Sequence, residues 1–550
     1  MQRRNRKIFR NCAALALLGL LSSCQTSKLP DPSAHISTAA RDPYPYQIVK
    51  KKSPELLSLK ELTTVLEDPK ASNHATKKAE RLMSSPFIDN THYYRHGLPK
   101  PNIYPELGPC LRVSTWNIEK SINVAEATKS LTSASVFEAQ LRPEVRKSKK
   151  ARNTALRQRL ALATSDVLLL QEMDIGHCRS GHLFAAKHIA QKMGMNFVYA
   201  PQQLEIDPVH LGVQHIMFPN SSVDQIACHA THGDPDDYKG VFGTAVLSRY
   251  PIKRVQVFPL KHQPYDWYAD EIKKPDFVEK GRKFGIQTLF GFRPTREVKA
   301  GGRGFTRVDL HVPDVPHETL TVINIHLEIK TTPSQRKKQL EEILGYINEV
   351  ENPVVLAGDF NSASRDVSST SFGRLTKRTA TNPTNIFSAT LWLANITGIN
   401  QLRGLLNFTK NFRDPLAPNI PIIFPNNTRS LFAMIKNYRF KDGGAFDFRG
   451  DRKHSTYKNA GPLSNSNQRY PFKGYTFTFN LPKPIGPFGR ERLDWILVKS
   501  FLTDPVDKKG PYKLAPHYGE TLSLFNYGVT KRFSDHHPIT TLLPLEEPEP

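Results

Sequence analysis

The sequence predicts an α/β sandwich with a large core. Three observations favour this fold class: 39% of the 550 residues are hydrophobic, short apolar runs recur along the chain, and helical stretches alternate with several of them. The apolar runs predict buried strands at residues 111–116, 167–171, 243–247, 320–325, 354–357 and 493–498. The predicted helices are residues 145–164, 181–193 and 334–350. Length alone would allow two to four domains, but this alternation indicates one compact unit.

The segment before the first predicted strand has a different composition. Residues 25–110 are rich in Pro, Ser, Lys and Tyr, with one expected helix at residues 54–67. Residues 99–109 hold four prolines and are expected to be irregular or extended. We therefore expect residues 24–110 to be a tether with an N-terminal extension, residues 111–543 to be the main domain, and residues 544–550 to be a tail.

Residues 365–490 interrupt the alternation of strands and helices. They are rich in Asn, Thr, Phe and Pro, and they include an aromatic segment at residues 475–479. Because a loop of this length without structure is uncommon inside a compact domain, we interpret it as an insertion with some structure of its own. Such an insertion could cover or widen a functional site.

The chain is strongly basic. Its net charge is +25, while charged residues make up 23% of the chain, which does not fit a disordered polyelectrolyte. The excess favours anionic partners such as nucleic acid, phospholipid headgroups or phosphorylated small molecules. A solvated basic surface without a specific ligand explains the charge equally well.

The first 23 residues have the order of an export signal. Five basic residues precede an apolar run at residues 13–21, which is too short to span a bilayer as a helix. Residues 21–24 read Leu-Ser-Ser-Cys and resemble the bacterial lipobox, which implies that Cys24 is acylated and becomes the first mature residue. An ordinary signal peptide with an incidental Cys24 is the alternative. Gln25, in place of an aspartate, favours the outer membrane over the inner membrane of a Gram-negative cell.

The remaining cysteines are Cys110, Cys178 and Cys228. They form no CxxC pair or Cys/His cluster, so the sequence does not predict a zinc site. One disulfide among the three is compatible with an oxidising compartment, and its pairing stays open.

Six polar motifs occur in order at the ends of predicted strands. They are Trp116-Asn117-Ile118-Glu119, Gln171-Glu172, Asn324-Ile325-His326, Gly358-Asp359-Phe360-Asn361, Leu493-Asp494-Trp495 and Ser534-Asp535-His536-His537-Pro538. Each alone is weak, but together they resemble the endonuclease/exonuclease/phosphatase superfamily, which contains pancreatic deoxyribonuclease, exonuclease III, bacterial sphingomyelinase and inositol polyphosphate 5-phosphatases. The resemblance covers residues 111–543 and implies a four-layer α/β/β/α sandwich of the deoxyribonuclease I-like type, with the insertion before the last strands.

The resemblance implies a metal-dependent phosphoesterase, whose reaction brings an oxygen nucleophile to an anionic phosphorus. His536 and Asp494 are the implied acid/base pair, and the pattern Ser-Asp-His-x-Pro selects His536 over His537. Asp359 could position or deprotonate the water. Amide and imidazole donors to the phosphate are expected from Asn361, Asn117 and His326. A turn-capping role for Asn117 and a backbone-satisfied, buried His326 are the structural alternatives.

The expected cofactor is Mg²⁺ or Mn²⁺, which takes carboxylate oxygens. Glu172 is the leading ligand implied by the resemblance, and Asp535 is expected to help hold the metal or orient the water. Glu119 matches an acidic second contact found in some branches of the superfamily and not in others. A helix cap or an arginine pair would be a purely structural role for Glu172.

The substrate is left open between three interpretations. A nuclease is slightly favoured by the basic charge and by the run Arg142–Arg159, in which seven more cations follow Arg142 and which could equally be a solvated helix face. A sphingomyelinase-type or phospholipid phosphodiesterase is favoured by the acyl anchor and the aromatic insertion, although no hydrophobic β-hairpin is obvious. A non-catalytic surface-binding protein is disfavoured because Glu172, Asp494 and His536 are all present.

Overall fold

The computed structural model describes most of the chain from residue 48 onward. The described residues are 48–105, 107–206, 211, 235–272, 297–363, 415–416, 426–447, 475–485, 488–504, 509–515 and 517–547. The predicted leader, Cys24, Cys228 and much of the predicted insertion lie outside them. None of the described helices is long and apolar enough to cross a membrane.

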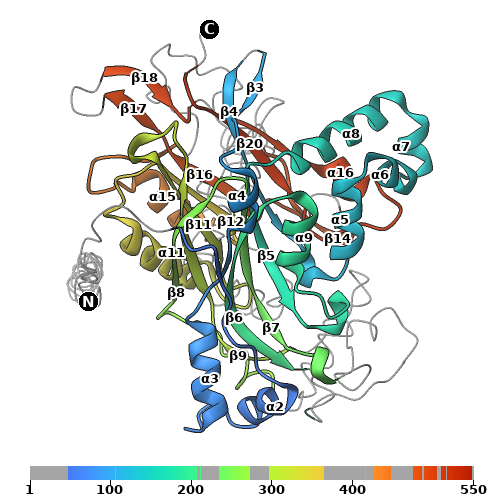
Figure 1. Cartoon of the computed structure of the whole chain (residues 1–550), viewed down its shortest axis with the longest axis vertical. Coiled ribbons are helices and arrows are strands. Elements are labelled where there is room, and N and C mark those ends of the chain that lie inside the picture. The colour runs from blue at the N-terminus through green and yellow to red at the C-terminus, as the bar shows by residue number, and fades with distance from the viewer. Residues whose placement is uncertain are drawn as a thin grey trace, which may run out of the picture.

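Two β-sheets face each other at the centre of the fold (Figure 1). The first has the path β1-β2-β6-β7-β5-β4-β20-β19, with β3 against β4 and β9 against β6. Its strands are β1 (Lys51–Lys52), β2 (Phe87–Asp89), β3 (Asn102–Tyr104), β4 (Gly108–Asn117), β5 (Val167–Ile175), β6 (Asn196–Ile206), β7 (Val241–Ser248), β9 (Val298–Gly301), β19 (Tyr518–Thr521) and β20 (Ile539–Pro544).

The second sheet has the order β13-β16-β12-β11-β10-β8. Its strands are β8 (Ile252–Pro259), β10 (Gly304–His311), β11 (Thr319–His326), β12 (Val354–Asp359), β13 (Phe446–Asp447) and β16 (Asp494–Lys499). Two separate hairpins are formed by β14 (Phe479–Ile485) with β15 (Phe488–Glu491), and by β17 (Phe501–Asp504) with β18 (Lys509–Lys513).

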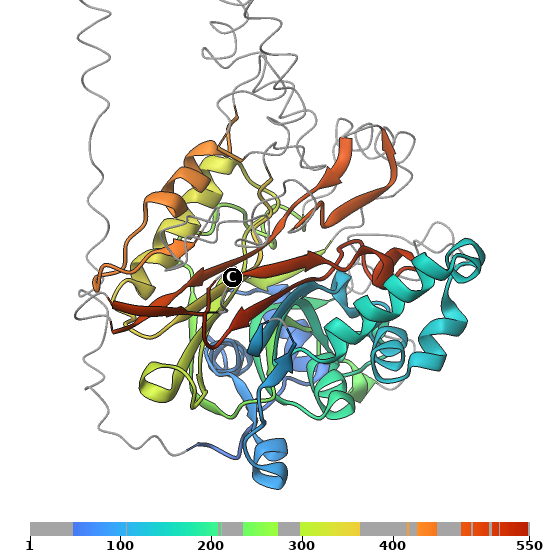
Figure 2. The same ribbon diagram turned by 90° about the horizontal axis from the view of Figure 1, so that it is seen from above.

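Helices cover the outer faces of both sheets, which gives four layers (Figure 2). The first sheet is covered by α5 (Val124–Thr132), α6 (Ala134–Gln140), α7 (Pro143–Lys147), α8 (Lys149–Ala163), α9 (Ala185–Met193) and α16 (Ser523–Tyr527). The second is covered by α11 (Pro333–Ile347) and α15 (Arg429–Asn437). The predicted α/β/β/α sandwich is confirmed.

Strand β5 shows why the sequence produces these layers. Its unbroken apolar run alternates between two interfaces: Val167 and Leu169 belong to the core between the sheets, whereas Leu168 and Leu170 belong to the core under the helices. Successive side chains of a strand point to opposite faces, so a strand covered on both faces must be apolar at every position. A third core lies between the second sheet and α11 and α15.

The N-terminal extension is folded onto the sandwich. Strands β1 and β2 add to the edge of the first sheet beside β6, and β3 pairs with β4. Helices α2 (Leu59–Glu67) and α3 (His74–Met83) pack against the same sheet, and α4 (Thr91–His96) follows. The expected helix at residues 54–67 begins at Leu59 because Ser58 forms a capping box with Glu61.

One expectation from the sequence needs correction. Residues 145–164 form two helices, because Ser148 ends α7 and its hydroxyl accepts from the backbone N–H of Ala151 to begin α8. Residues 99–109, expected to be irregular or extended, contain the strand β3, which agrees with the extended alternative. Within the predicted insertion, α15 packs beside α11, and β13 pairs with β16. Cys178 is disulfide-bonded, and Cys110 is buried and free.

Candidate active site

Three predicted site residues lie in one row across the second sheet. His326 is paired with Asp359 where β11 and β12 run parallel, and Asp359 is paired with Asp494 where β12 and β16 run antiparallel. All three are buried. Because pairing fixes which residues lie side by side, three motifs far apart in the sequence meet at one edge of the sheet.

Asn117 joins this row to the first sheet. It ends β4, beside the parallel strand β5 that carries Glu172. Its amide nitrogen lies 3.1 Å from Glu172 Oε1 and 3.1 Å from Asp359 Oδ2. The side chain therefore bridges carboxylates from the two sheets, which is more than the turn cap considered for it from the sequence.

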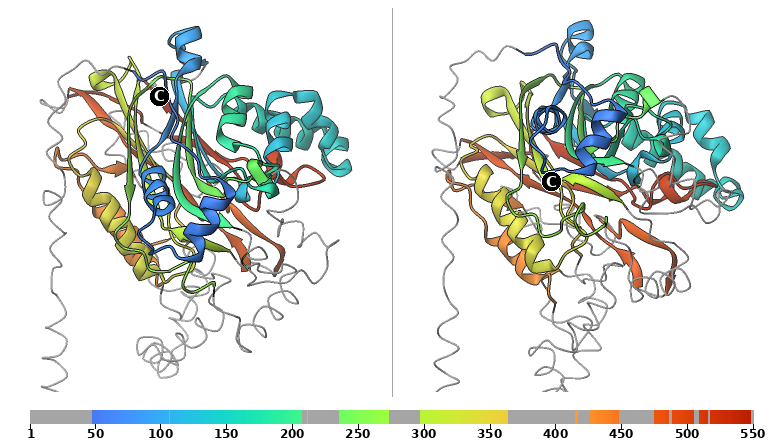
Figure 3. Two further views of the ribbon diagram at one scale, coloured as in Figure 1. Left: turned by 60° about the horizontal axis from the view of Figure 1, so that its bottom comes forward. Right: turned by 90° about the horizontal axis from the view of Figure 1, so that it is seen from below.

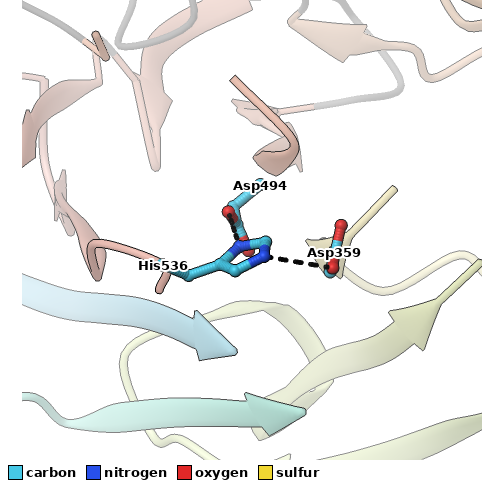
Figure 4. A group of neighbouring side chains, drawn as sticks. All are labelled: Asp359, Asp494 and His536. Atoms are coloured by element: carbon cyan, nitrogen blue, oxygen red, sulfur yellow. Dashed lines mark hydrogen bonds and ion pairs between the residues drawn. The ribbon is translucent and has the colours of Figure 1, made fainter. Parts of the chain in front are cut away.

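His536 completes the group shown in Figure 4. Its Nδ1 lies 2.8 Å from Asp494 Oδ2, and its Nε2 lies 3.9 Å from Asp359 Oδ2. Burial alone would lower the pKa of this imidazole, but the negative charges of Asp494 and Asp359 raise the pKa well above its ordinary value. The ring is therefore held protonated between two carboxylates.

The loop that carries His536 is held by side chains that the sequence did not single out. Asn526 donates to the backbone carbonyls of Ser534 (2.7 Å) and His536 (2.8 Å), and it accepts from the backbone N–H of Ser534 (3.0 Å). Ser534 Oγ donates to the carbonyl of Asn117 (2.7 Å). Ser534 stands within a recognisable motif, whereas nothing in the sequence marks Asn526.

His326 is held by Arg303, another residue that sequence reasoning missed. Arg303 Nη1 lies 2.8 Å from His326 Nδ1. Burial and the charge of Arg303 lower the pKa of His326 well below its ordinary value, so the ring is neutral. Its Nε2 lies 3.6 Å from Asp359 Oδ2 and 3.8 Å from Glu172 Oε1. His326 therefore has a side-chain partner, not the backbone partner considered as its structural alternative.

Asp359 lies at the centre of these contacts. Burial raises the pKa of its carboxyl to about 7, against the opposing effect of His536. A carboxylate with a pKa in this range can exchange a proton near neutral pH. Its Oδ1 accepts from the backbone N–H of Asn361 (2.7 Å).

The carboxylate of Glu172 is fixed by a strained turn. Glu119, Lys120 and Ser121 have positive φ angles of 47°, 54° and 56°, and Glu172 itself has a φ of 58° within a β-bulge. Glu172 Oε2 accepts from the backbone N–H of Lys120 (3.1 Å), and Ser121 Oγ donates to the carbonyl of Glu172 (3.2 Å). Non-glycine residues rarely adopt this conformation unless their surroundings impose it.

The remaining predicted residues lie around this centre. The Asn361 amide donates to the carbonyl of Leu327 (2.8 Å), so it is engaged in the fold as well as adjacent to Asp359. Asp535 is half-buried, and its Oδ1 lies 3.5 Å from Ser534 Oγ. His537 contacts Asn480 (3.3 Å between Nε2 and Nδ2) and the ring of Tyr527, and burial lowers the pKa of its imidazole to about 3.

Two sets of side chains could hold a cation. Asp359, Asp494 and His536 offer ligand atoms within 4.8 Å of one another. Glu119, Glu172 and Asp535 are a second candidate on electrostatic grounds alone: burial and the charge of Asp535 raise the pKa of Glu119 to about 8, with Glu172 adding to the effect. Carboxylates that crowd in this way fit a hard divalent cation, because the cation would relieve their repulsion.

The geometry agrees with a comparison against known families. The profile of the Endonuclease/Exonuclease/phosphatase family matches residues 114–536. The chain belongs to this family. The match includes the predicted site residues of all six motifs up to His536, and membership of this family supports a phosphoesterase.

Comparisons with individual proteins are more distant. No curated protein matches the chain significantly. Similar solved structures include an endonuclease/exonuclease/phosphatase from Beutenbergia cavernae (15% identity, 79% of this chain and 71% of that chain, TM-score 0.32). An AP endonuclease from Archaeoglobus fulgidus has 12% identity over 79% and 99% of the two chains, with a TM-score of 0.33. A 3'-5' exonuclease from Neisseria meningitidis has 16% identity over 78% and 98%, with a TM-score of 0.31.

Proposed function

We propose that the chain hydrolyses phosphodiester bonds by direct attack of water, and that its substrate is a nucleic acid. The observation that carries the reaction is the environment of Asp359 Oδ2. Three nitrogens surround it, from Asn117 (3.1 Å), His326 (3.6 Å) and His536 (3.9 Å). A phosphate placed at this edge would therefore meet several donors and one carboxylate of near-neutral pKa.

Each residue has a distinct task in this proposal. Asp359 accepts a proton from the attacking water, for which its raised pKa suits it. Neutral His326 donates through Nε2 to a phosphoryl oxygen, and Asn117 donates through its amide. The protonated His536, oriented by Asp494, supplies a proton on the leaving-group side. Asn361 supports Asp359 by donating to its Oδ1.

The metal is assigned to the carboxylate set, with Glu172 as the main ligand and with Glu119 and Asp535 beside it. Mg²⁺ or Mn²⁺ bound there would neutralise charge on the phosphate. We favour this set over Asp359, Asp494 and His536, because Asp494 and His536 already share a hydrogen bond of 2.8 Å that orients the imidazole.

The nucleic-acid substrate is supported by a basic corner between α7 and α8. Of the seven cations that follow Arg142 in the run to Arg159, three are engaged within the fold: Arg152 with Glu138, Arg157 with Glu520, and Arg159 with backbone carbonyls. The other four are exposed and form the α7–α8 corner, namely Arg146, Lys147, Lys149 and Lys150. Exposed lysines and arginines on a phosphoesterase favour a polyanionic substrate.

A lipid phosphodiesterase is the second candidate, favoured by the hairpin β14–β15. The hairpin begins at Phe479, whose ring lies 5.2 Å from the ring of His536. Apolar residue types recur in its sequence, among them Phe479, Leu481 and Ile485. The sequence had shown no obvious hydrophobic hairpin.

The two candidates are separated by offering the chain plasmid DNA, RNA, sphingomyelin vesicles and phosphoinositide vesicles in parallel with Mg²⁺ or Mn²⁺, and with EDTA as the control. Metal-dependent nicking of DNA, lost in Asp359→Asn, is the expected result. Turnover of vesicles with DNA untouched would transfer the proposal to the lipid class. Absence of metal-dependent turnover for all four substrates would contradict both.

A further inference from the structure

Exposed apolar side chains are concentrated in the N-terminal extension. The described part of the chain exposes six large hydrophobic residues, and four of them lie between residues 49 and 103. They are Val49 (46% exposed), Tyr94 (50%), Leu98 (42%) and Ile103 (80%). Single exposed hydrophobics are common on protein surfaces, but here four of the six described ones fall within this one part of the chain.

Unpaired cations lie among these apolar residues. Lys50, Lys51, Lys52, Arg95 and Lys100 are exposed, and none of the five forms an ion pair with another described residue. Lys50 Nζ lies 5.8 Å from the centre of the Tyr94 ring, and the Tyr94 hydroxyl donates to the carbonyl of Ile48. We call the four apolar residues and five cations together the basal patch.

A chain of hydrogen bonds places α4 and β3 at the same end of the sandwich. The backbone N–H of Tyr93 donates to Asn196 (2.9 Å), which donates to the carbonyl of Arg249 (3.4 Å). Arg249 pairs with Asp166 (2.9 Å), and Asn102 donates to the same carboxylate (3.4 Å). Figure 3 shows α4 standing out from the body of the domain.

This end lies opposite the candidate active site. Asp166 and Asn196 stand at the starts of β5 and β6, whereas Asn117 and Glu172 stand toward the ends of β4 and β5. A strand rises about 3.3 Å per residue, so the ten residues of β4 separate the two ends by roughly 30 Å. The basal patch and the catalytic residues therefore face in different directions.

The path of the chain connects the basal patch to the predicted membrane anchor. Ile48 is the first described residue, and it enters the fold within the basal patch through its bond to Tyr94. The predicted acylated Cys24 precedes it by only 24 residues. A segment of this length reaches at most about 80 Å even when fully extended.

We propose that the basal patch lies on the headgroup region of an anionic phospholipid bilayer and directs the active site away from that membrane. Lysines attract anionic headgroups, and a tyrosine or leucine side chain can enter the interface between headgroups and acyl chains. A basic and apolar surface beside an acyl anchor supplies a second attraction to the same membrane. The substrate then arrives from the aqueous phase, as a nucleic acid would.

The test uses the chain from Gln25 onward, which lacks the anchor and keeps every described residue. Its binding to vesicles of pure phosphatidylglycerol and of pure phosphatidylcholine is measured by sedimentation at low salt. Strong binding is expected to phosphatidylglycerol alone. The triple variant Lys50→Gln, Lys51→Gln, Lys52→Gln should lose about 100-fold in affinity, at about five-fold for each charge. The double variant Tyr94→Ser, Leu98→Ser should weaken the part of the vesicle binding that persists at high salt.

The matched control removes three charges at the α7–α8 corner. Arg146→Gln, Lys147→Gln, Lys149→Gln should leave vesicle binding within two-fold of the parent (about two-fold is 0.4 kcal/mol). An environment-sensitive dye on Leu98→Cys should shift to the blue on phosphatidylglycerol vesicles, while the same dye on Leu160→Cys should not. Equal vesicle binding by the two triple variants would overturn the proposal. So would a dimer, detected by sedimentation equilibrium, that requires Tyr94 and Leu98.

These measurements do not depend on catalysis. A chain that binds vesicles through the basal patch but cleaves no DNA would retain this inference and contradict the proposed function. A chain that cleaves DNA but does not bind vesicles would support the proposed function and contradict this inference.

Discussion

The guanidinium of Arg303 donates to Nδ1 of His326 across 2.8 Å, which fixes the tautomer of the histidine. An arginine side chain has donors and no acceptor, so Nδ1 must carry the lone pair and Nε2 must carry the hydrogen. That hydrogen is on the side of Glu172 and Asp359. Arg303 is therefore a positioning residue, although it stands outside the motifs that identify the family.

Replacement of Arg303 should remove the contact that holds the hydrogen of His326 on Nε2. In Arg303→Gln the loss of the positive charge should raise the pKa of His326, which NMR of labelled histidine would detect. The kcat should also fall by about 10- to 100-fold, as it does when other residues that orient a histidine are removed. The control is Arg307→Gln, which breaks an ion pair with Asp309 on the same strand. It should leave the pKa of His326 and kcat unchanged. An unchanged His326 titration in Arg303→Gln would contradict the assignment.

Replacement of the adjacent histidines His536 and His537 should affect kcat very differently. His536→Ala should reduce kcat by roughly 10²–10⁴-fold, because the ring paired with Asp494 is the proposed acid. His537→Gln should retain activity within a few-fold, since its contacts are with Asn480 and Tyr527. Steady-state kinetics with thermal unfolding of both variants makes the comparison. If His537→Gln lost as much activity as His536→Ala, the choice of catalytic ring would be wrong.

Glu172→Gln tests the metal assignment. Gln keeps an oxygen that can accept from the Lys120 N–H but loses the charge, so activity at saturating Mg²⁺ should fall by at least about 100-fold. Addition of Mg²⁺ should also raise the Tm of the parent and not that of the variant, because ligand binding stabilises the folded state. Glu341→Gln, which removes a surface partner of Lys337, is the control. A variant whose Tm still rises with Mg²⁺ would point to the other ligand set.

Acid should destabilise the fold partly through His177. Burial lowers the pKa of this imidazole to about 4, against the opposing effect of Asp174. The unfolded chain, with a histidine pKa near 6.5, binds the proton more tightly, so stability is complete above about pH 6.5 and falls as the pH drops toward 4. The contribution is up to about 3 kcal/mol. Urea unfolding of the parent and of His177→Gln at pH 8 and pH 5 should show a smaller loss in the variant; parallel losses would refute this role.

The sequence predicted the layers because each core strand is apolar on both faces, as β5 is. It also predicted which polar residues would end the strands, since the motifs follow the apolar runs directly. It could not predict that Asp359 lies beside Asp494, because that neighbourhood depends on the pairing of β12 with β16 across more than one hundred residues. Arg303 escaped for the same reason: its contact with His326 depends on how β10 returns beside β11.

Local chemistry explains the helices that were misjudged. Residues 145–164 have a continuous helical pattern, but the Ser148 hydroxyl offers the backbone a cap that divides the helix. Helices α5 and α6 were not predicted at all. They are short, and Ser133 ends one and caps the other, which leaves no long periodic stretch to recognise.

The last strand described, β20, pairs with β4, the strand that ends in Asn117, and His536 stands just before β20. A growing chain therefore holds Asn117, Glu172, His326, Asp359 and Asp494 long before it has a docked catalytic imidazole. During synthesis the enzyme would remain inert until its C-terminal strand had been made and inserted beside β4. The order of the chain would therefore make the candidate site the last part of the domain to be completed.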